Sequence, residues 1–265
     1  MQRRLDSLIV PLRERPERSA LLTDVDGTIA PITSEPADAA VPEKTRQILR
    51  RLAERYALVG CLSGRRAIDA RRVVGLAELA YSGNHGFELL LPGEDEARPD
   101  PSLEGHEADA PRFVASLDRS GLMRVGIRTE DKGPIVALHW RGAPNEEAAE
   151  SLAEEIASEA ERHGLVPHRG RKVLEIRPDV AINKGSAVAA LIPARPLDAA
   201  LYGGDDRTDL DAFAALRTLA ERGELQTAVC IAVASDESPP EVSQAADLTV
   251  SGPVGFVQVL EALAE

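Results

Sequence analysis

Residues 20–29 read Ala20-Leu-Leu-Thr-Asp-Val-Asp-Gly-Thr-Ile29, a short apolar run that ends in two carboxylates and a glycine. Such a run predicts a buried strand whose carboxyl end opens onto a loop. In open α/β sheets, ligands bind at that end of the strands. The stretch therefore predicts an α/β fold with a functional site directly after this strand.

The two acids of this stretch predict a metal site. Side chains alternate along a strand, so Asp24 and Asp26 can point the same way. Two carboxylates this close repel each other unless a cation lies between them, and Mg²⁺ takes such oxygen ligands together with substrate phosphate. Gly27 permits a close backbone approach, and Thr28 offers a hydroxyl to a phosphate oxygen. Taken alone, the stretch also fits a solvated pair of acids in a turn.

Later segments repeat this arrangement of an apolar run followed by polar residues. Ser63-Gly64-Arg65 follows the run 56–62, where a hydroxyl and free N–H groups at a helix start favour an anion, or form a plain helix cap. Lys184 stands at the start of an apolar helix and either carries positive charge to the site or lies at the surface. His85 sits between two glycines, in a ligand-binding or a structural turn. Three acids then fall within five positions, too many for burial without a cation: Asp205, Asp206 and Asp209.

Composition limits the partners and the location of the protein. The 265 residues carry a net charge of -13, from 44 acidic and 31 basic side chains, which argues against nucleic acid or an anionic membrane as the main partner. Cys61 and Cys230 lie in apolar runs and are expected to pack in the core. Because no apolar run approaches 18 residues and the N-terminus lacks an apolar leader, we expect a cytoplasmic protein without a membrane span. We also expect a monomer.

Helical and strand periodicities divide the chain into a core and an inserted part. The acidic stretch 92–111, rich in proline and glycine, is expected to be a linker that leaves the first sheet. The segment after it has the order αββαββ, which predicts a small α+β layer. Its elements are expected at 109–119, 122–130, 134–140, 145–163, 165–169 and 172–177. The predicted domains are a core over 1–107 and 181–265 and an inserted cap over 108–180.

The inserted part carries its own polar cluster. Mixed charged side chains that share a strand face are typical of sites that grip hydroxyl-rich ligands such as sugars, and are also typical of solvated strand faces. The cluster consists of Glu130, Lys132, His139, Arg141, Arg169, Lys172, Glu175 and Arg177.

Four separated motifs together resemble the haloacid dehalogenase (HAD) superfamily of aspartate-nucleophile phosphatases. They are Asp24-Val-Asp-Gly-Thr28, Ser63-Gly-Arg65, Lys184-Gly185 and Gly204-Asp-Asp-Arg-Thr-Asp209. Within that superfamily the chain resembles the trehalose-6-phosphate phosphatase family, through Gly83-Asn-His-Gly86, Glu130-Asp-Lys132, His139-Trp-Arg141, Glu175-Ile-Arg-Pro178 and residues 205–213. The resemblance implies a Rossmann-like core with a mostly parallel sheet and an inserted α+β cap domain.

The resemblance also implies roles for individual residues. Asp24 would be the nucleophile that forms an aspartyl-phosphate, Asp26 the general acid and base, and Thr28, Ser63 and Lys184 the groups that hold the phosphoryl oxygens. Mg²⁺ would be held by Asp24, the Asp26 backbone carbonyl and Asp205, with Asp206 and Asp209 as further ligands or supports. The sugar would be bound by Arg65, His85, Glu130, Lys132 and Glu175.

The implied reaction is hydrolysis of trehalose 6-phosphate, a small-molecule sugar phosphate, to trehalose and phosphate. Alternatives are a phosphatase for sucrose 6-phosphate or a glycosyl-glycerol phosphate, a phosphomutase, and a non-catalytic sugar-phosphate sensor. Three residues depart from the family pattern: Asn84 stands in place of Ser, Asn183 in place of Asp, and Leu210 in place of Glu.

Overall fold

The computed structural model describes residues 2–33, 38–170, 172–192, 194, 196–236 and 238–265. The chain divides into two compact units. The first unit comprises Met1–Asp100 and Ile182–Glu265, and the second comprises Pro101–Ala181. The domain limits expected from the sequence, at 107/108 and 180/181, stay predictions.

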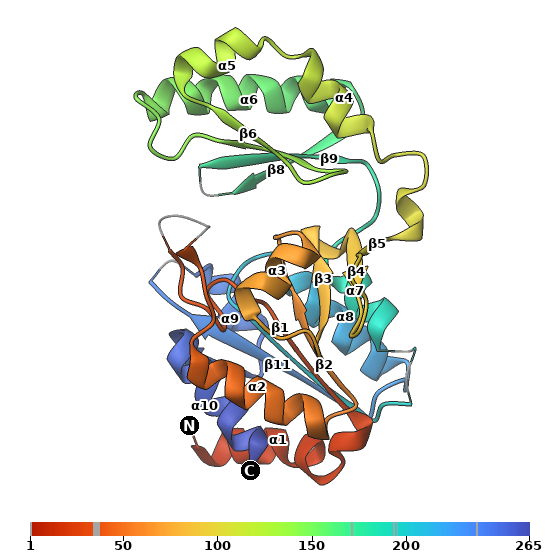
Figure 1. Ribbon diagram of the computed structural model, residues 1–265. Coiled ribbons are helices and arrows are strands. Elements are labelled where there is room, and N and C mark those ends of the chain that lie inside the picture. The colour runs from red at the N-terminus through yellow and green to blue at the C-terminus, as the bar shows by residue number, and fades with distance from the viewer. Residues whose placement is uncertain (1, 34–37, 171, 193, 195, 237) are drawn as a thin grey trace. The chain divides into compact units, whose positions relative to one another are not determined.

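An eight-stranded sheet runs through the first unit in the order β12-β11-β10-β1-β2-β3-β4-β5 (Figure 1). The six strands from β12 to β3 are parallel, and β4 and β5 continue the sheet antiparallel. The expected α/β fold with a mostly parallel sheet is confirmed. The strands are β1 (Ser19–Thr23), β2 (Leu58–Leu62), β3 (Ala80–Gly83), β4 (Glu88–Leu90), β5 (Arg98–Pro99), β10 (Ala199–Gly204), β11 (Thr227–Ala234) and β12 (Leu248–Ser251).

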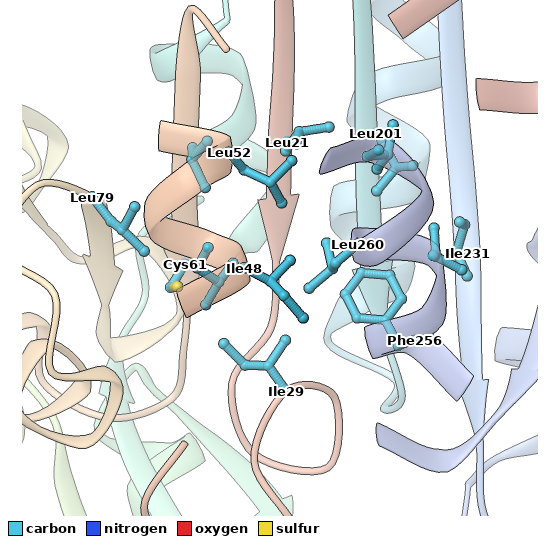
Figure 2. Packing of buried hydrophobic residues seen from close by; sticks show 14 of the residues in the cluster. Leu21, Ile29, Ile48, Leu52, Cys61, Leu79, Leu201, Ile231, Phe256 and Leu260 are labelled. Carbon is cyan, nitrogen blue, oxygen red and sulfur yellow. The ribbon is translucent and has the colours of Figure 1, made fainter. Parts of the chain in front are cut away.

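Alternation along the strands gives this sheet an apolar layer on each face. Leu21 of β1 packs with one group of helices, while its neighbours Ala20 and Leu22 pack with the other. Figure 2 shows the first layer, where Ile48 and Phe256 meet the strands. The first group is α1 (Gln2–Glu14), α2 (Glu43–Arg55), α3 (Ala67–Val74) and α10 (Gly252–Ala264), and the second is α7 (Lys184–Leu191), α8 (Asp209–Glu221) and α9 (Pro240–Ala245). Both cysteines are buried in these layers, as expected.

The second unit is a four-stranded antiparallel sheet in the order β6-β7-β9-β8, with helices on one face (Figure 1). Leu138, Leu174 and Ile176 point to the helices and form the apolar core of this unit. The residues that alternate with them carry the polar side chains of the opposite face. The elements are α4 (Asp109–Ser116), α5 (Arg119–Val125), β6 (Arg128–Asp131), β7 (Val136–His139), α6 (Glu146–Arg162), β8 (Leu165–Gly170) and β9 (Val173–Pro178).

Two segments differ from the sequence-based expectation. A strand was predicted over 122–130, but residues 119–125 form α5, because Asp118 caps its N-terminus and Gly126 ends it at φ 82°. The predicted linker 92–111 contains β5, which pairs with β4.

Along the described residues, no helix combines the length and the apolar character that crossing a membrane requires.

Candidate active site

Parallel pairing of β1 with β10 brings two acidic loops to one edge of the sheet. Thr23 lies opposite Gly203 in the register, and the Asp24 N–H donates to the Gly203 carbonyl at 2.8 Å. The Thr28 hydroxyl, which is buried, donates to Asp205 Oδ1 at 2.9 Å. Residues 177 positions apart in the chain are therefore joined directly beyond the ends of their strands.

Lys184 lies between two carboxylates at this edge. Its Nζ is 2.6 Å from Asp24 Oδ1 and 2.7 Å from Asp209 Oδ1, and its side chain is 3% exposed. Asn183 fixes this position, because its side chain caps α7 by accepting the Ser186 N–H. Burial alone would lower the pKa of Lys184, but Asp209 and Asp24 raise it above its ordinary value. The ammonium group therefore stays charged.

The nearby acids have environments that disfavour charge. Burial raises the pKa of Asp24 well above its usual value, and Asp209 and Asp205 add to this, while Lys184 opposes it. Burial and Asp209 raise the pKa of Asp205 to about 7 against the hydrogen bond from Thr28. A cation bound beside these oxygens would reverse both shifts.

Asp24, Asp205 and Asp209 each offer an oxygen atom, and these three atoms lie within 4.8 Å of one another. Hard oxygen donors at this spacing suit Mg²⁺. The three acids differ in the number of hydrogen bonds that they accept. Asp209 Oδ1 accepts from Lys184 and Tyr202, at 2.7 Å each, and its Oδ2 accepts the N–H groups of Asp205 and Asp206, at 2.9 Å each. Four donors therefore already occupy the two carboxylate oxygens of Asp209.

The adjacent acid Asp206 lies outside this triad. Its side chain is exposed, and its Oδ1 accepts the Arg207 N–H at 2.7 Å. Asp206 as a metal ligand stays a prediction.

Asp26 is held by Arg65 in a two-point ion pair. The guanidinium donates from Nε to Oδ2 at 2.7 Å and from Nη2 to Oδ1 at 2.8 Å. Both carboxylate oxygens therefore accept hydrogen bonds from a cation. Arg65 thus contacts the expected proton donor, and its expected contact with the sugar stays a prediction.

Ser63 and His85 lie in the loops that follow β2 and β3. The His85 N–H donates to the Ser63 carbonyl at 2.9 Å, and the Ser63 hydroxyl accepts the Arg65 N–H at 3.1 Å. The imidazole lies against Gly64, where an added Cβ would be 2.5 Å from Nε2. Asn84 and His85 both have positive φ values, of 51° and 59°. Asparagine tolerates this conformation well, which accounts for Asn84 in this turn.

The open face of the second sheet carries a compact charged group. Glu175 Oε1 is 2.8 Å from Lys132 Nζ, and Glu175 Oε2 accepts from Arg177 Nη2 at 2.6 Å. Glu130 pairs with His139 at 2.8 Å, and the hydrogen bond from His139 lowers the pKa of Glu130. The structure thus groups Glu130, Lys132 and Glu175 on one face, and their contact with a sugar stays a prediction. Arg169 and Lys172 instead pair with Glu154 and Glu146 of α6.

The family model described as trehalose-phosphatase matches residues 22–253, which include nearly all of the residues above. The chain belongs to the trehalose-phosphatase family. It is 34% identical over 260 residues to a trehalose-phosphate phosphatase of Mycobacterium marinum, covering 91% of this chain and 62% of the relative. It is 31% identical over 220 residues to a trehalose 6-phosphate phosphatase of Zea mays, covering 76% and 60%. The matched part is thus about three fifths of the length of these curated relatives.

Solved structures share the fold of this trehalose-phosphatase family member. The C-terminal domain of Candida albicans trehalose-6-phosphate phosphatase matches with a TM-score of 0.78 at 21% identity, over 97% of this chain and 96% of that one. The C-terminal domain of a Candida albicans trehalose synthase regulatory protein matches with a TM-score of 0.71 at 15% identity, over 94% of each chain.

The other two departures from the family pattern also have a structural explanation. Asn183 caps α7 through a side-chain oxygen, which an aspartate would also supply. Leu210 packs against the apolar layer under α7 and α8. Leu210 is partly buried there, and its apolar side chain adds to this packing.

Sequence reasoning missed Tyr202 as a site residue. Its hydroxyl contacts Asp209 from within β10, although the residue stands in a run that otherwise reads as plain core. The signal was available: a single aromatic hydroxyl lies directly before Gly203-Gly204 and the acids. A buried tyrosine hydroxyl needs a hydrogen-bond partner, and the acids that follow Tyr202 in the sequence include that partner, Asp209.

Gly27→Ala is expected to destabilise the first unit and to displace Asp205. Gly27 has φ +86°, and an added Cβ would lie 2.3 Å from Asp205 Oδ2. Gly93→Ala is a matched control, because Gly93 lies in the same unit and has φ +82° with nothing within 4 Å. The control should cost about 1–2 kcal/mol from backbone strain alone, and Gly27→Ala clearly more. Urea unfolding of both variants measures this difference, and equal losses would show that the contact with Asp205 is unimportant.

Proposed function

We propose that this protein hydrolyses trehalose 6-phosphate to trehalose and phosphate through an aspartyl-phosphate on Asp24. The observation that carries the proposal is the contact of the buried Lys184 ammonium with Asp24 at the carboxyl end of β1. A cation in this position fixes the orientation of a nucleophile and faces the phosphoryl charge. Membership of the trehalose-phosphatase family supports the substrate.

In the first step, an Asp24 carboxylate oxygen attacks phosphorus and the bond from phosphorus to the sugar oxygen breaks. Lys184 stabilises the charge on the phosphoryl oxygens, together with the hydroxyls of Thr28 and Ser63. Thr28 donates to Asp205 in this structure, so contact with phosphate requires its hydroxyl to change partner. Water then attacks the phosphorus of the intermediate, which restores the Asp24 carboxylate and releases phosphate.

Asp26 supplies a proton to the leaving sugar oxygen and later takes one from the attacking water. The ion pair with Arg65 occupies both oxygens of this carboxylate. Protonation weakens the hydrogen bond from Arg65 to the oxygen that carries the proton, because a hydroxyl oxygen is a poorer acceptor than a carboxylate oxygen. We therefore expect Arg65 to loosen its contact with one oxygen of Asp26 before the first step.

The donor set fits Mg²⁺, with Asp24 and Asp205 as the side-chain ligands. When bound, the ion would neutralise these carboxylates and withdraw charge from the phosphoryl group. Gly27 supports this assignment, since its lack of a side chain gives Asp205 the space it occupies. Asp209 holds the backbone of the Asp205 loop in place.

Recognition of the sugar is proposed for the open face of the second unit. Carboxylates accept hydrogen bonds from sugar hydroxyls, and ammonium groups donate to them. Glu175 and Lys132 are buried enough to be held rigidly, and Glu130 is oriented by His139. Such a group discriminates among sugars by the positions of their hydroxyls.

Phosphate release should depend on a divalent metal and favour trehalose 6-phosphate. The assay compares trehalose 6-phosphate with sucrose 6-phosphate, a glycosyl-glycerol phosphate and an aryl phosphate, with Mg²⁺ and after EDTA treatment. EDTA should abolish turnover, and Mg²⁺ should restore it. Preference for another sugar phosphate would overturn the substrate but keep the chemistry. Full activity in EDTA would overturn the metal assignment.

Two neighbouring acids provide a matched test of the metal site. Asp205→Asn should weaken Mg²⁺ binding at least about tenfold, as loss of a metal ligand or its support does. Asp206→Asn should change it little, because that side chain is exposed and bonded to its own loop. Calorimetric titration with Mg²⁺ measures both. If both substitutions weakened Mg²⁺ binding equally, this would contradict the assignment of Asp205, and not Asp206, as the metal ligand.

A non-catalytic sugar-phosphate sensor is the second candidate. One solved structure with this fold is the C-terminal domain of a trehalose synthase regulatory protein. Binding of trehalose 6-phosphate without release of phosphate from any ester, in the presence of Mg²⁺, would favour this candidate.

A further inference from the structure

Tyr202 places a hydroxyl inside the acidic cluster. The side chain is fully buried on β10, and its O–H donates to Asp209 Oδ1 at 2.7 Å. The ring packs edge-on against Phe213, with centroids 5.9 Å apart and an interplanar angle of 80°. The hydroxyl is therefore held at one position by the rest of the ring.

The acceptor of this hydrogen bond is shared with Lys184. Asp209 Oδ1 receives the Tyr202 hydroxyl and the Lys184 ammonium at the same distance. Lys184 in turn divides its hydrogen bonds between Asp209 and Asp24. A second donor on Oδ1 reduces the charge that this oxygen presents to Lys184. The Lys184 ammonium is then attracted less strongly to Asp209.

Burial raises the pKa of Tyr202 well above its ordinary value, and the neighbouring Asp209 and Asp24 add to this. The hydroxyl therefore stays protonated and acts as a donor. It is buried beside Asp209 rather than exposed to a ligand, so its effect on chemistry must pass through Asp209 and Lys184.

The geometry points to Tyr202 as a positioning residue that, through Asp209, keeps the Lys184 ammonium on Asp24. This inference rests on the proposed function for its consequence in catalysis, but the position of Lys184 is measurable without any substrate. Without the hydroxyl, Asp209 Oδ1 has an unused acceptor site in a dry environment, and Lys184 moves toward it.

The first test follows the Lys184 ammonium directly by proton–nitrogen NMR of lysine side chains. The chain has only four lysines, Lys44, Lys132, Lys172 and Lys184. Lys44 and Lys172 are exposed, and Lys132→Arg identifies the signal of Lys132. The buried ammonium of Lys184 should exchange slowly and give a sharp signal. Tyr202→Phe, which keeps the ring, should shift or broaden that signal.

Tyr81→Phe is the matched control. Tyr81 is also fully buried in the first unit, and its hydroxyl donates to the Leu76 carbonyl, outside the acidic cluster. Both substitutions remove one buried hydrogen bond, so both should lower the unfolding temperature. Only Tyr202→Phe should move the Lys184 signal. An unchanged signal in Tyr202→Phe, or an equal change in the control, would overturn the inference.

The second test is kinetic. Tyr202→Phe should lower kcat about tenfold and change KM less than about twofold, since one hydrogen bond to a charged group is lost where charge develops. Tyr81→Phe should keep kcat. A wild-type protein that releases phosphate from no ester would refute the proposed function, and the NMR test would still decide the role of Tyr202.

A third measurement keeps the hydroxyl, in case Tyr202→Phe does not fold. The chain contains three tyrosines, and replacing all of them by 3-fluorotyrosine makes each hydroxyl a stronger donor. The Lys184 signal should then shift in the folded protein. A Lys184 signal identical to that of the unlabelled protein would count against coupling through Asp209.

Discussion

Asp24→Asn is expected to reduce phosphate release on the order of 10⁴-fold or more while the fold is retained, as removal of a nucleophile does in other enzymes. An amide has nearly the shape of the carboxylate, but its neutral oxygen is too weak a nucleophile to displace the sugar oxygen from phosphorus and form the acyl phosphate. Lys184 keeps Asp209 as a partner in this variant. Turnover under saturating trehalose 6-phosphate and Mg²⁺, together with circular dichroism, measures both parts of the expectation. A variant with a near wild-type rate would refute Asp24 as the nucleophile.

Asp26→Asn distinguishes the role of Asp26 as proton donor from the role of Asp24 as nucleophile. An aryl phosphate releases a weakly basic phenolate that needs no proton, so Asp26→Asn should still show a burst of phenolate equal to the enzyme concentration. Asp24→Asn should show no burst. Acid quenching during the burst should trap phosphate on the protein. Full turnover without a trapped phosphoryl group would indicate direct attack by water instead.

The sequence predicted the edge of the sheet where the site lies. The apolar runs before Asp24 and Asp205 form β1 and β10, and parallel pairing alone brings the ends of these two strands together. Burial on both faces also follows from the unbroken apolar run at residues 20–22. The cause is local: apolar spacing and a terminal glycine determine a strand and its turn without help from distant residues.

The partners of each charge could not be predicted in the same way. Asp205 and Asp206 are equivalent as neighbouring acids in the sequence, and only the turn into α8 makes the first buried and the second exposed. Arg65 could reach a ligand or Asp26, and nothing in its spacing distinguishes these. Spacing did identify Lys184 as a helix-start lysine. Its position between Asp24 and Asp209 depends on contacts over 160 and 25 residues.

Helix α5 was mispredicted for a related reason. Its seven residues, Arg-Ser-Gly-Leu-Met-Arg-Val, contain a glycine and only a short apolar pattern. Helix propensity is a weak guide over so few residues. The capping contact of Asp118 and the packing of Leu122 in the core of the second unit stabilise it instead.

Lys184→Met should be the most destabilising substitution in the acidic cluster. Methionine keeps most of the side-chain volume but removes the charge, which leaves Asp24 and Asp209 as buried acids without their cation. Breaking a buried ion pair in this way costs about 3–5 kcal/mol. The matched control is Lys44→Met in the same unit. Lys44 pairs with Glu261 at 2.6 Å, but its side chain is 75% exposed, so its loss should cost at most about 1 kcal/mol.

The pH dependence of this loss follows from the direction of the pKa shift of Asp24. Burial already raises that pKa, and removing Lys184, which opposes the rise, would raise it further. A carboxyl whose pKa is higher in the folded state favours folding when protonated and opposes it when ionised. The stability lost in Lys184→Met should therefore be smaller at about pH 5 and larger at about pH 8. A loss that falls as the pH rises would contradict buried, unpaired acids as the cause.

A second substitution tests whether unpaired charge is the cause rather than poor packing of methionine. Asp24→Asn in the Lys184→Met background removes one of the two acids that lost their cation. The double variant should therefore be more stable than Lys184→Met alone, although each substitution removes a native interaction. Urea unfolding followed by circular dichroism gives these free energies, and fluorescence of Trp140, the single tryptophan, reports the second unit separately. A double variant less stable than Lys184→Met would contradict this explanation. It would show that the Asp24 carboxyl stabilises the fold even when Lys184 is absent.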